Sequence, residues 1–194
     1  MAGGEAMFAK KEWKQNLLGV FEICLFMPSG VERFQNTRSA AIRSFVIPLA
    51  LLPIAMFALV TMSEGFSYSL IVSLHLLRMI FAFAVFFTVV YFLCRQFDRQ
   101  YHFYRFLNVA NWSNVAGAVL TLPISLYFLA GLEVETLESY AVFITILGYI
   151  YSAFILTNCF KIPWEMGGFI AIVGLAIDQN LFDLTIFLRD IISA

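Results

Sequence analysis

The chain has 194 residues, of which 61% are hydrophobic, 17% aromatic and only 13% charged, and its formal net charge is −1. A soluble globular chain is roughly 45–50% apolar and about 25% charged, so this chain would have too little polar surface to cover itself in water. The same figures exclude a disordered chain, a disulfide-stapled secreted domain and a nucleic-acid binder that depends on a basic surface. We therefore expect a protein that crosses a membrane several times.

Residues 1–44 precede the first long apolar run and form the expected cytoplasmic segment. Residues 8–27 place apolar side chains at helical spacing, with lysines and Glu22 at polar positions, which is typical of an amphipathic helix in the membrane interface. Pro28 ends this helix, and the capping-box spacing of Ser29 and Glu32 predicts a second short helix that runs into the membrane. The side chains expected at the membrane surface, the cationic ones against anionic lipid headgroups, are Lys10, Lys11, Trp13, Lys14, Arg33, Arg38 and Arg43.

Residues 45–194 form the expected membrane domain. A helix that crosses a hydrocarbon core of about 30 Å needs roughly 20 apolar residues, and helices satisfy their own backbone polar groups there. Polar residues interrupt the last apolar run, so it either continues to about Ile186 or stops near Ala176 before a short amphipathic helix over 181–192. The sequence therefore predicts an all-α, five-helix transmembrane bundle with these spans: Phe45–Met62, Ser69–Cys94, Phe106–Ala130, Tyr140–Phe160 and Trp164 to about Ile186.

The distribution of basic residues predicts the orientation. Lys and Arg lie before the first span, between the second and third spans, and between the fourth and fifth spans, whereas the other two loops hold Glu and neither Lys nor Arg. By the positive-inside rule, the N-terminus is cytoplasmic and, after five crossings, the C-terminus lies on the opposite side.

Ionisable residues at membrane depth are the best pointers to function in this class of protein. His75 and Arg78 share one face of the second span, and Arg78 lies about 14 Å from the outer end of that span. Asp178 lies roughly 21 Å from the inner end of the fifth span, at comparable height. We therefore predict an Arg78–Asp178 pair, with His75, Gln179 or Asn180 alongside. The pair is either a clamp between two spans or a site for an ion, a lipid headgroup or a substrate.

The third span begins with polar side chains. Asn111, Asn114 and Ala118 share a face of small or hydrogen-bonding groups, which favours a helix–helix seam, and the alternative is the lining of a polar cavity. The candidate intramembrane polar site therefore comprises His75, Arg78, Asn111, Asn114, Asp178 and Asn180.

Small residues and prolines predict how the spans meet. Glycines in the fifth span allow a close approach to its neighbours, and prolines in the first and third spans are expected to kink or break their helices. These residues are Gly167, Gly168, Gly174, Pro48, Pro53 and Pro123.

The sequence lacks the residue sets that support catalysis. It has no G-x-S-x-G or H-E-x-x-H motif and no glycine-rich phosphate loop, and its two histidines are too few for haem or for a multi-histidine metal site. Its three cysteines are scattered without metal-ligand spacing and are expected to be small apolar fillers. We therefore expect no enzyme activity and no catalytic, cofactor or metal site.

Several short motifs resemble the Yip family of Ypt/Rab-interacting membrane proteins and their bacterial relatives. They are Leu25-Phe26-Met27-Pro28 with Phe34 six residues later, Val46-Ile47-Pro48 at the start of the first span, and Leu147-Gly148-Tyr149-Ile150-Tyr151-Ser152 in the fourth. The resemblance covers about residues 20 to 185 and implies five spans with a cytoplasmic N-terminus. The acidic-Leu-Tyr-Gly-Pro signature of the eukaryotic members is absent, so the chain is most similar to the bacterial members, which implies a non-enzymatic protein of the bacterial inner membrane.

Two functions follow as expectations. The first is a scaffold, assembly factor or membrane-organising component, whose amphipathic segment and small-residue seams contact a protein partner or another copy of the chain. The second is a small transporter or channel subunit built around the intramembrane polar residues. The N-terminal segment itself is either a plain anchor over the inner mouth of the bundle or a docking surface.

Overall fold

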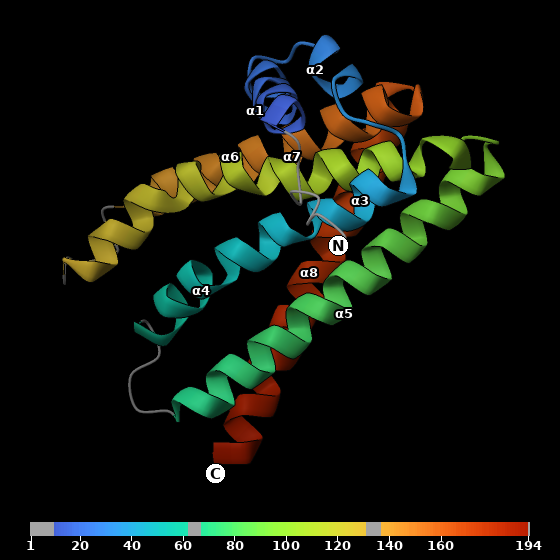
Figure 1. The fold of residues 1–194 in the computed structure, drawn as a ribbon. Helices are drawn as coiled ribbons and strands as arrows, with labels where there is room; N and C mark the ends of the chain where they lie inside the picture. Colours follow the sequence, from blue (N-terminus) through green and yellow to red (C-terminus); the bar gives the residue numbers. More distant parts are fainter. Residues whose placement is uncertain (1–9, 62–66, 131–136, 194) are drawn as a thin grey trace, which may run out of the picture.

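The computed structural model describes residues 10–61, 67–130 and 137–193, and these residues fold into helices (Figure 1). Five segments are long and apolar enough to cross a membrane, namely Arg38–Met56, Tyr68–Gln96, Gln100–Tyr127, Glu138–Phe160 and Trp164–Ile192. The expected all-α fold with five spans is therefore confirmed. The helices are α1 (Lys10–Cys24), α2 (Ser29–Glu32), α3 (Arg38–Ser44), α4 (Val46–Thr61), α5 (Tyr68–Gln96), a 3-10 turn η1 (Gln100–His102), α6 (Phe103–Leu129), α7 (Glu138–Phe160) and α8 (Trp164–Ser193).

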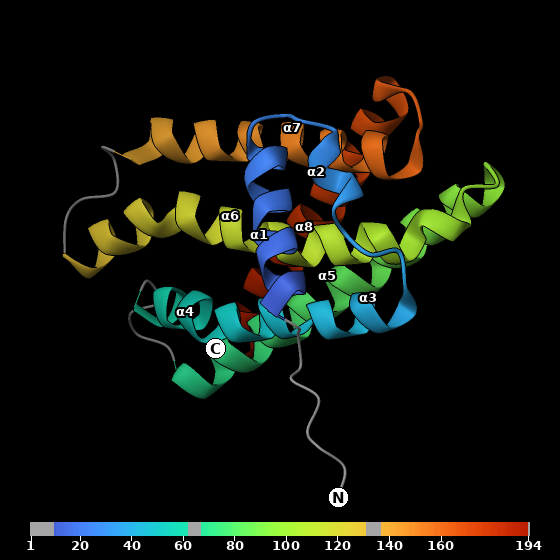
Figure 2. The same cartoon turned by 45° about the horizontal axis from the view of Figure 1, so that its top comes forward.

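The long helices form a ring. α4 packs against α6, α6 against α7, α7 against α8, α8 against α5, and α5 against α4. Figure 1 shows α6 beside α7 and α5 beside α8, and these two pairs meet at one end and spread apart towards the other. α1 and α2 lie across α6 and α7 near the end where the pairs meet (Figure 2). We call this end, which carries Arg95, Arg99 and Lys161, the basic end.

The buried core lies towards the basic end. Its side chains come from the last turns of α5, the first turns of α6, the last turns of α7 and the first turns of α8, and the N-terminal segment adds more. The halves of the spans away from the basic end are more loosely packed. The largest buried members of the core include Phe34, Val90, Phe106, Trp112, Leu156, Phe160 and Ile170.

The helix that enters the membrane is capped at Thr37 and not at Ser29. The Thr37 hydroxyl accepts a hydrogen bond of 3.3 Å from the Ala40 backbone N–H, which caps the start of α3. α2 begins at Ser29 as predicted but ends at Glu32 after one turn. The predicted capping box is wrong, because the Ser29 hydroxyl donates to Glu22 at 3.1 Å instead.

One proline interrupts the first span. The helix is broken at Phe45, between α3 and α4. Pro48 accounts for the break because its ring nitrogen has no N–H to donate to the Ser44 carbonyl. The expectation for Pro48 is confirmed, whereas Pro53 and Pro123 lie inside α4 and α6 without ending them.

The fifth span is one continuous helix. α8 runs from Trp164 to Ser193, so the alternative with a stop near Ala176 is wrong. Its glycines do permit close contacts, as expected. A Cβ added at Gly167 would lie 2.8 Å from the Ala153 carbonyl oxygen of α7, and one at Gly174 would lie 2.7 Å from the Phe86 ring of α5.

Candidate functional site

The predicted ion pair between spans two and five is confirmed and joins α5 to α8. Arg78 Nη1 donates a hydrogen bond of 2.8 Å to Asp178 Oδ1. The Arg78 side chain is 15% exposed and that of Asp178 is 58% exposed, so the carboxylate lies at the rim of the contact. Arg78 Cζ also lies 5.3 Å from the centroid of the Phe182 ring, a cation–π distance. α8 thus supplies both an anion and an aromatic face to a cation that is costly to bury in lipid.

His75 lies one helical turn from Arg78 and faces the same part of α8. Its ring centroid is 6.2 Å from that of Phe182. His75 Nδ1 is buried and has no hydrogen-bond partner among the described residues. The structure therefore brings together His75, Arg78 and Asp178 from the candidate site.

The three asparagines of the candidate site lie apart from this cluster. Asn111 Nδ2 donates 2.9 Å to the Ser44 hydroxyl of α3, which makes it part of the predicted helix–helix seam. Asn114 donates to two carbonyls of its own helix, at 3.0 and 3.1 Å. Asn180 is exposed and donates 2.7 Å to the Ala176 carbonyl of α8. The six predicted residues thus form separate contacts and do not line one common cavity.

A cavity of about 310 Å³ lies between α6 and α7, with α1 along one side. Gly117 and Gly148 line it, and no atom lies within 4 Å of a Cβ added at either glycine. A second cavity of about 220 Å³ lies between α4, α5 and α6. The two cavities adjoin each other at α6, where Asn114, Gly117 and Thr121 line both of them. Most of the remaining lining is apolar, for example Val20, Ile23, Phe86, Ile144 and Ile155. Such cavities suit apolar groups better than ions.

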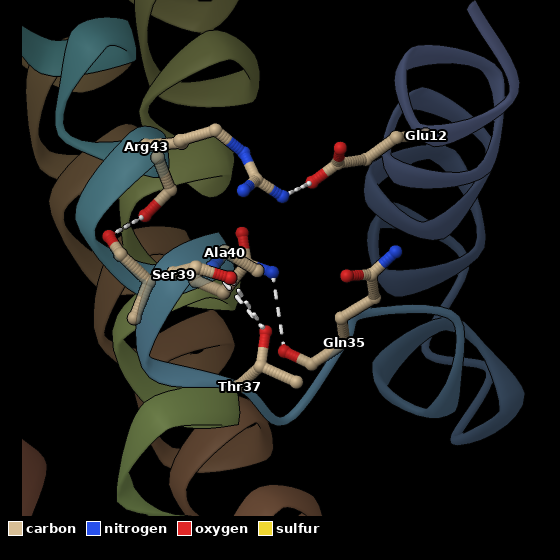
Figure 3. A network of polar contacts seen from close by, with 9 residues as sticks. Glu12, Gln35, Thr37, Ser39, Ala40 and Arg43 are labelled. Atoms are coloured by element: carbon tan, nitrogen blue, oxygen red, sulfur yellow. Dashed lines mark hydrogen bonds and ion pairs between the residues drawn. The ribbon is translucent and has the colours of Figure 1, made fainter. Parts of the chain in front are cut away.

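Two arginine–glutamate pairs fasten α1 to the elements that follow it. Arg43 Nη2 of α3 donates 2.9 Å to Glu12 Oε1 of α1, across the gap between the two helices (Figure 3). Arg33 binds Glu22 as a fork, with Nε donating 2.8 Å to Oε2 and Nη2 donating to Oε1. Both glutamates are 8% exposed. Glu22 therefore does not lie on a solvated face, and two of the three arginines predicted to meet headgroups, Arg33 and Arg43, are held by carboxylates.

The Glu22–Arg33 pair changes the titration of both groups. The hydrogen bonds from Arg33 lower the pKa of the Glu22 carboxyl below its ordinary value, more than partial burial raises it, and the Ser29 hydroxyl adds to the lowering. The bonds to Glu22 in turn raise the pKa of Arg33. The pair is therefore charged throughout the neutral range.

α1 has three distinct faces, whereas the amphipathic pattern of the sequence predicts two. One face packs on the protein and consists of Glu12, Asn16, Gly19, Val20 and Ile23. The next carries the exposed apolar side chains Trp13, Leu17 and Phe21, and the third carries Lys11, Lys14 and Gln15. Headgroup contact stays a prediction for Lys11, Trp13, Lys14 and Arg38, while Phe8 and the Lys10 side chain lie outside the described part of the chain. A helix with three such faces is suited to lie between protein, lipid and water.

Aromatic and amide side chains complete the attachment of the N-terminal segment. Trp13 makes an edge-on contact with Trp112 of α6, with ring centroids 4.8 Å apart. Tyr151 of α7 donates 2.8 Å to the Cys24 carbonyl at the end of α1. In the loop before α3, the amide of Asn36 donates 2.8 Å to the Tyr101 carbonyl and accepts 3.0 Å from the Arg105 N–H.

The amino-acid sequence carries only a weak signal for this attachment. Glu12, Asn16, Gly19 and Ile23 follow a helical spacing that is a signal for a packed face, but two of the four are polar. A single asparagine in a loop, such as Asn36, gives no signal beyond a turn.

Residues 10–61, 67–130 and 137–193 contain no group of three His, Cys, Asp or Glu side chains that could hold a metal ion. Cys94 and Cys159 are buried, and Cys24 is partly buried. The chain matches no protein-family model, no curated protein and no solved structure.

Proposed function

We propose that the protein is a non-enzymatic membrane scaffold or assembly component that presents a rigid N-terminal platform to a protein partner. The platform is α1, α2 and α3. The proposal rests on the attachment of α1 by the Glu12–Arg43 and Glu22–Arg33 pairs. A helix that only anchors the chain gains its affinity from lipid and needs no charged pairs on its protein side. A helix whose orientation is already fixed loses less conformational entropy when a partner binds, so it offers a preorganised binding surface.

The intramembrane polar groups support the same proposal. Arg78 is bound by Asp178 and Phe182, and Asn111 by Ser44. These contacts hold helices together, and the two cavities beside them are mostly apolar. A transport pathway for a polar solute requires polar groups that converge on one water-filled space, so the geometry favours the scaffold over the transporter.

The proposal is tested by photo-crosslinking in native membranes. A photoreactive amino acid is placed at Gln15 or Leu18, both exposed on α1, and at Ile146, which is exposed on α7, as the control. We expect one protein adduct of defined mass from the α1 positions and none from Ile146. The adduct should disappear in the double variant Arg33→Gln/Arg43→Gln, which removes both ion pairs that orient α1. If the α1 positions label only lipid, or if the adduct persists in the double variant, the rigid platform is refuted.

We further propose that the chain is a bacterial-type relative of the Yip family and lies in a bacterial inner membrane with a cytoplasmic N-terminus. Arg95, Arg99 and Lys161 lie at the same end of the bundle as α1, which supports this orientation by the positive-inside rule. Tags on the two termini, probed from each side of intact cells, should be found in different compartments. Two tags in one compartment would refute the orientation.

A further inference from the structure

The outward face of α8 carries polar side chains in the half of the helix away from the basic end. Gln179 and Asp183 are exposed, and Gln179 Nε2 donates 3.1 Å to Asp183 Oδ1 one turn along. At 100° per residue they lie on the side of α8 opposite Gly174, which packs against Phe86 of α5, and opposite the buried Thr185. The face therefore points away from the rest of the described protein.

This polar face lies within the expected span. Gln179 is about 22 Å along the axis from Trp164, where α8 begins, and Asp183 is about 28 Å from it. The hydrocarbon core is about 30 Å thick, so Asp183 lies near its outer boundary, whereas lipid alone would leave the Gln179 amide poorly solvated about 8 Å inside it. Protein that covers the face and offers hydrogen bonds removes that cost.

The exposed residues on this face follow an alternating three- and four-residue spacing. They are Ile172, Ala176, Gln179 and Asp183, each exposed in the structure. This is the spacing of the seam between two nearly parallel helices in a left-handed pair. Small and amide-bearing residues are enriched in such seams inside membranes, because they allow close approach and hydrogen bonds between helices.

We propose that a second copy of the chain covers this face, through a parallel α8–α8 contact centred on Gln179. All copies of a membrane protein insert with the same orientation, so a two-fold axis along the membrane normal places each residue beside its own counterpart. An amide suits this arrangement, since it both donates and accepts hydrogen bonds and is therefore complementary to itself.

The two Asp183 carboxyls constrain the seam. In the two-fold pair they approach each other and repel, unless a donor lies between them. Gln179 already donates to Asp183 within one helix, and its side-chain carbonyl stays available to the other copy. The seam therefore has one residue that holds the dimer together and one that limits its stability.

Disulfide trapping tests the contact. In a background with the three natural cysteines replaced by alanine, Ala176→Cys places a thiol on the seam. Leu184→Cys is the matched control, because Leu184 is also exposed but lies about 140° from Gln179 around α8. Mild oxidation of native membranes should link Ala176→Cys into dimers of twice the chain mass, several-fold more than Leu184→Cys. Equal trapping at the two positions, adducts of other mass only, or no trapping would overturn the dimer.

Two further variants act on the seam in opposite directions. Gln179→Leu should raise the dimer dissociation constant roughly tenfold, because the hydrogen bonds across the seam are lost. Asp183→Asn should lower it, because the facing charges are removed while hydrogen-bonding capacity remains. Single-molecule photobleaching in liposomes measures both. A Gln179→Leu protein that dimerises as well as the original chain refutes the proposal.

This inference deepens the proposed scaffold function by naming one partner, and the two fail separately. If no α8 disulfide forms but photo-crosslinked adducts form at Gln15 and Leu18, the dimer proposal is refuted and the scaffold proposal is kept. If the α1 adducts are absent but the α8 disulfide forms, the platform proposal is refuted and the dimer proposal is kept.

Discussion

Arg78 and Asp178 are one hundred residues apart in the chain and bind each other at 2.8 Å across the contact between α5 and α8. The arginine is covered by Phe182 and the aspartate stays at the rim. The pair thus fixes the register of two antiparallel spans at a depth where water is scarce.

Charge exchange tests this pair. Arg78→Asp or Asp178→Arg alone places two like charges at the α5–α8 contact, so each should lower thermal stability in detergent by the equivalent of about 1–2 kcal/mol. The double exchange should recover most of the loss. Equal stability of the single variants, or a double variant no better than either, would contradict a stabilising pair.

The Glu22–Arg33 pair predicts a dependence of α1 attachment on pH. The hydrogen bonds from Arg33 lower the pKa of Glu22 from its ordinary value of 4.5. A lowered pKa in the folded state means that the stabilisation is present above pH about 4.5 and is lost as the pH falls through the lowered value. Proteolysis between α1 and α3 should therefore accelerate in acid.

Glu22→Gln is the control for this pH effect. It removes the titrating carboxyl, so proteolysis should be faster than in the original chain at neutral pH and should no longer change through the acid transition. An unchanged acid transition in Glu22→Gln would assign the effect to another group.

Gly30→Ala should separate α1 from α2. A Cβ at Gly30 would lie 2.7 Å from the Gly19 carbonyl oxygen and 2.9 Å from the Ile23 backbone nitrogen, and neither backbone atom can move aside cheaply. Overpacking of this kind costs about 1–3 kcal/mol. The expected result is a lower melting temperature and faster cleavage of the N-terminal segment.

Gly117→Ala is the matched exchange. No atom lies within 4 Å of its added Cβ, and alanine favours the helix by about 1 kcal/mol, so this variant should be at least as stable as the original. Destabilisation of the same size in both variants would show that the clash at Gly30 is not the cause.

Cys24 should react slowly with alkylating reagents near neutral pH. Burial raises the pKa of its thiol above the ordinary value of 9.0, and only the thiolate is reactive. In a variant with Cys94 and Cys159 replaced by alanine, the rate of maleimide labelling should keep rising with pH beyond 9. A cysteine at exposed Gln15 should label faster at pH 7, and equal rates would contradict the burial of Cys24.

Much of the fold follows from local sequence properties. The number of spans depends on the free energy of transfer from water to the membrane, summed over each run of about 20 residues. Neighbouring helices hardly change this sum. The Arg78–Asp178 pair was also predictable, because only two charges of opposite sign lie at that depth in the two spans. Their high cost in lipid leaves few alternatives to pairing.

Other features needed the tertiary structure. Glu12 and Glu22 have the sequence pattern of solvated residues on an amphipathic helix, yet they bind Arg43 and Arg33. Thr37 and Ser29 both lie at the start of helical turns, so local pattern does not distinguish between them as the cap.

The sequence by itself determined which segments leave water and which end of the bundle is basic, because those outcomes are sums over residues along the chain. Only the tertiary structure decided which face of α1 packs on the protein, and that α8 continues past Asp178 as one helix with its polar side turned outward. Such outcomes depend on the rotation and crossing of whole helices. The close packing of many side chains from distant segments sets those angles, and no single segment specifies them.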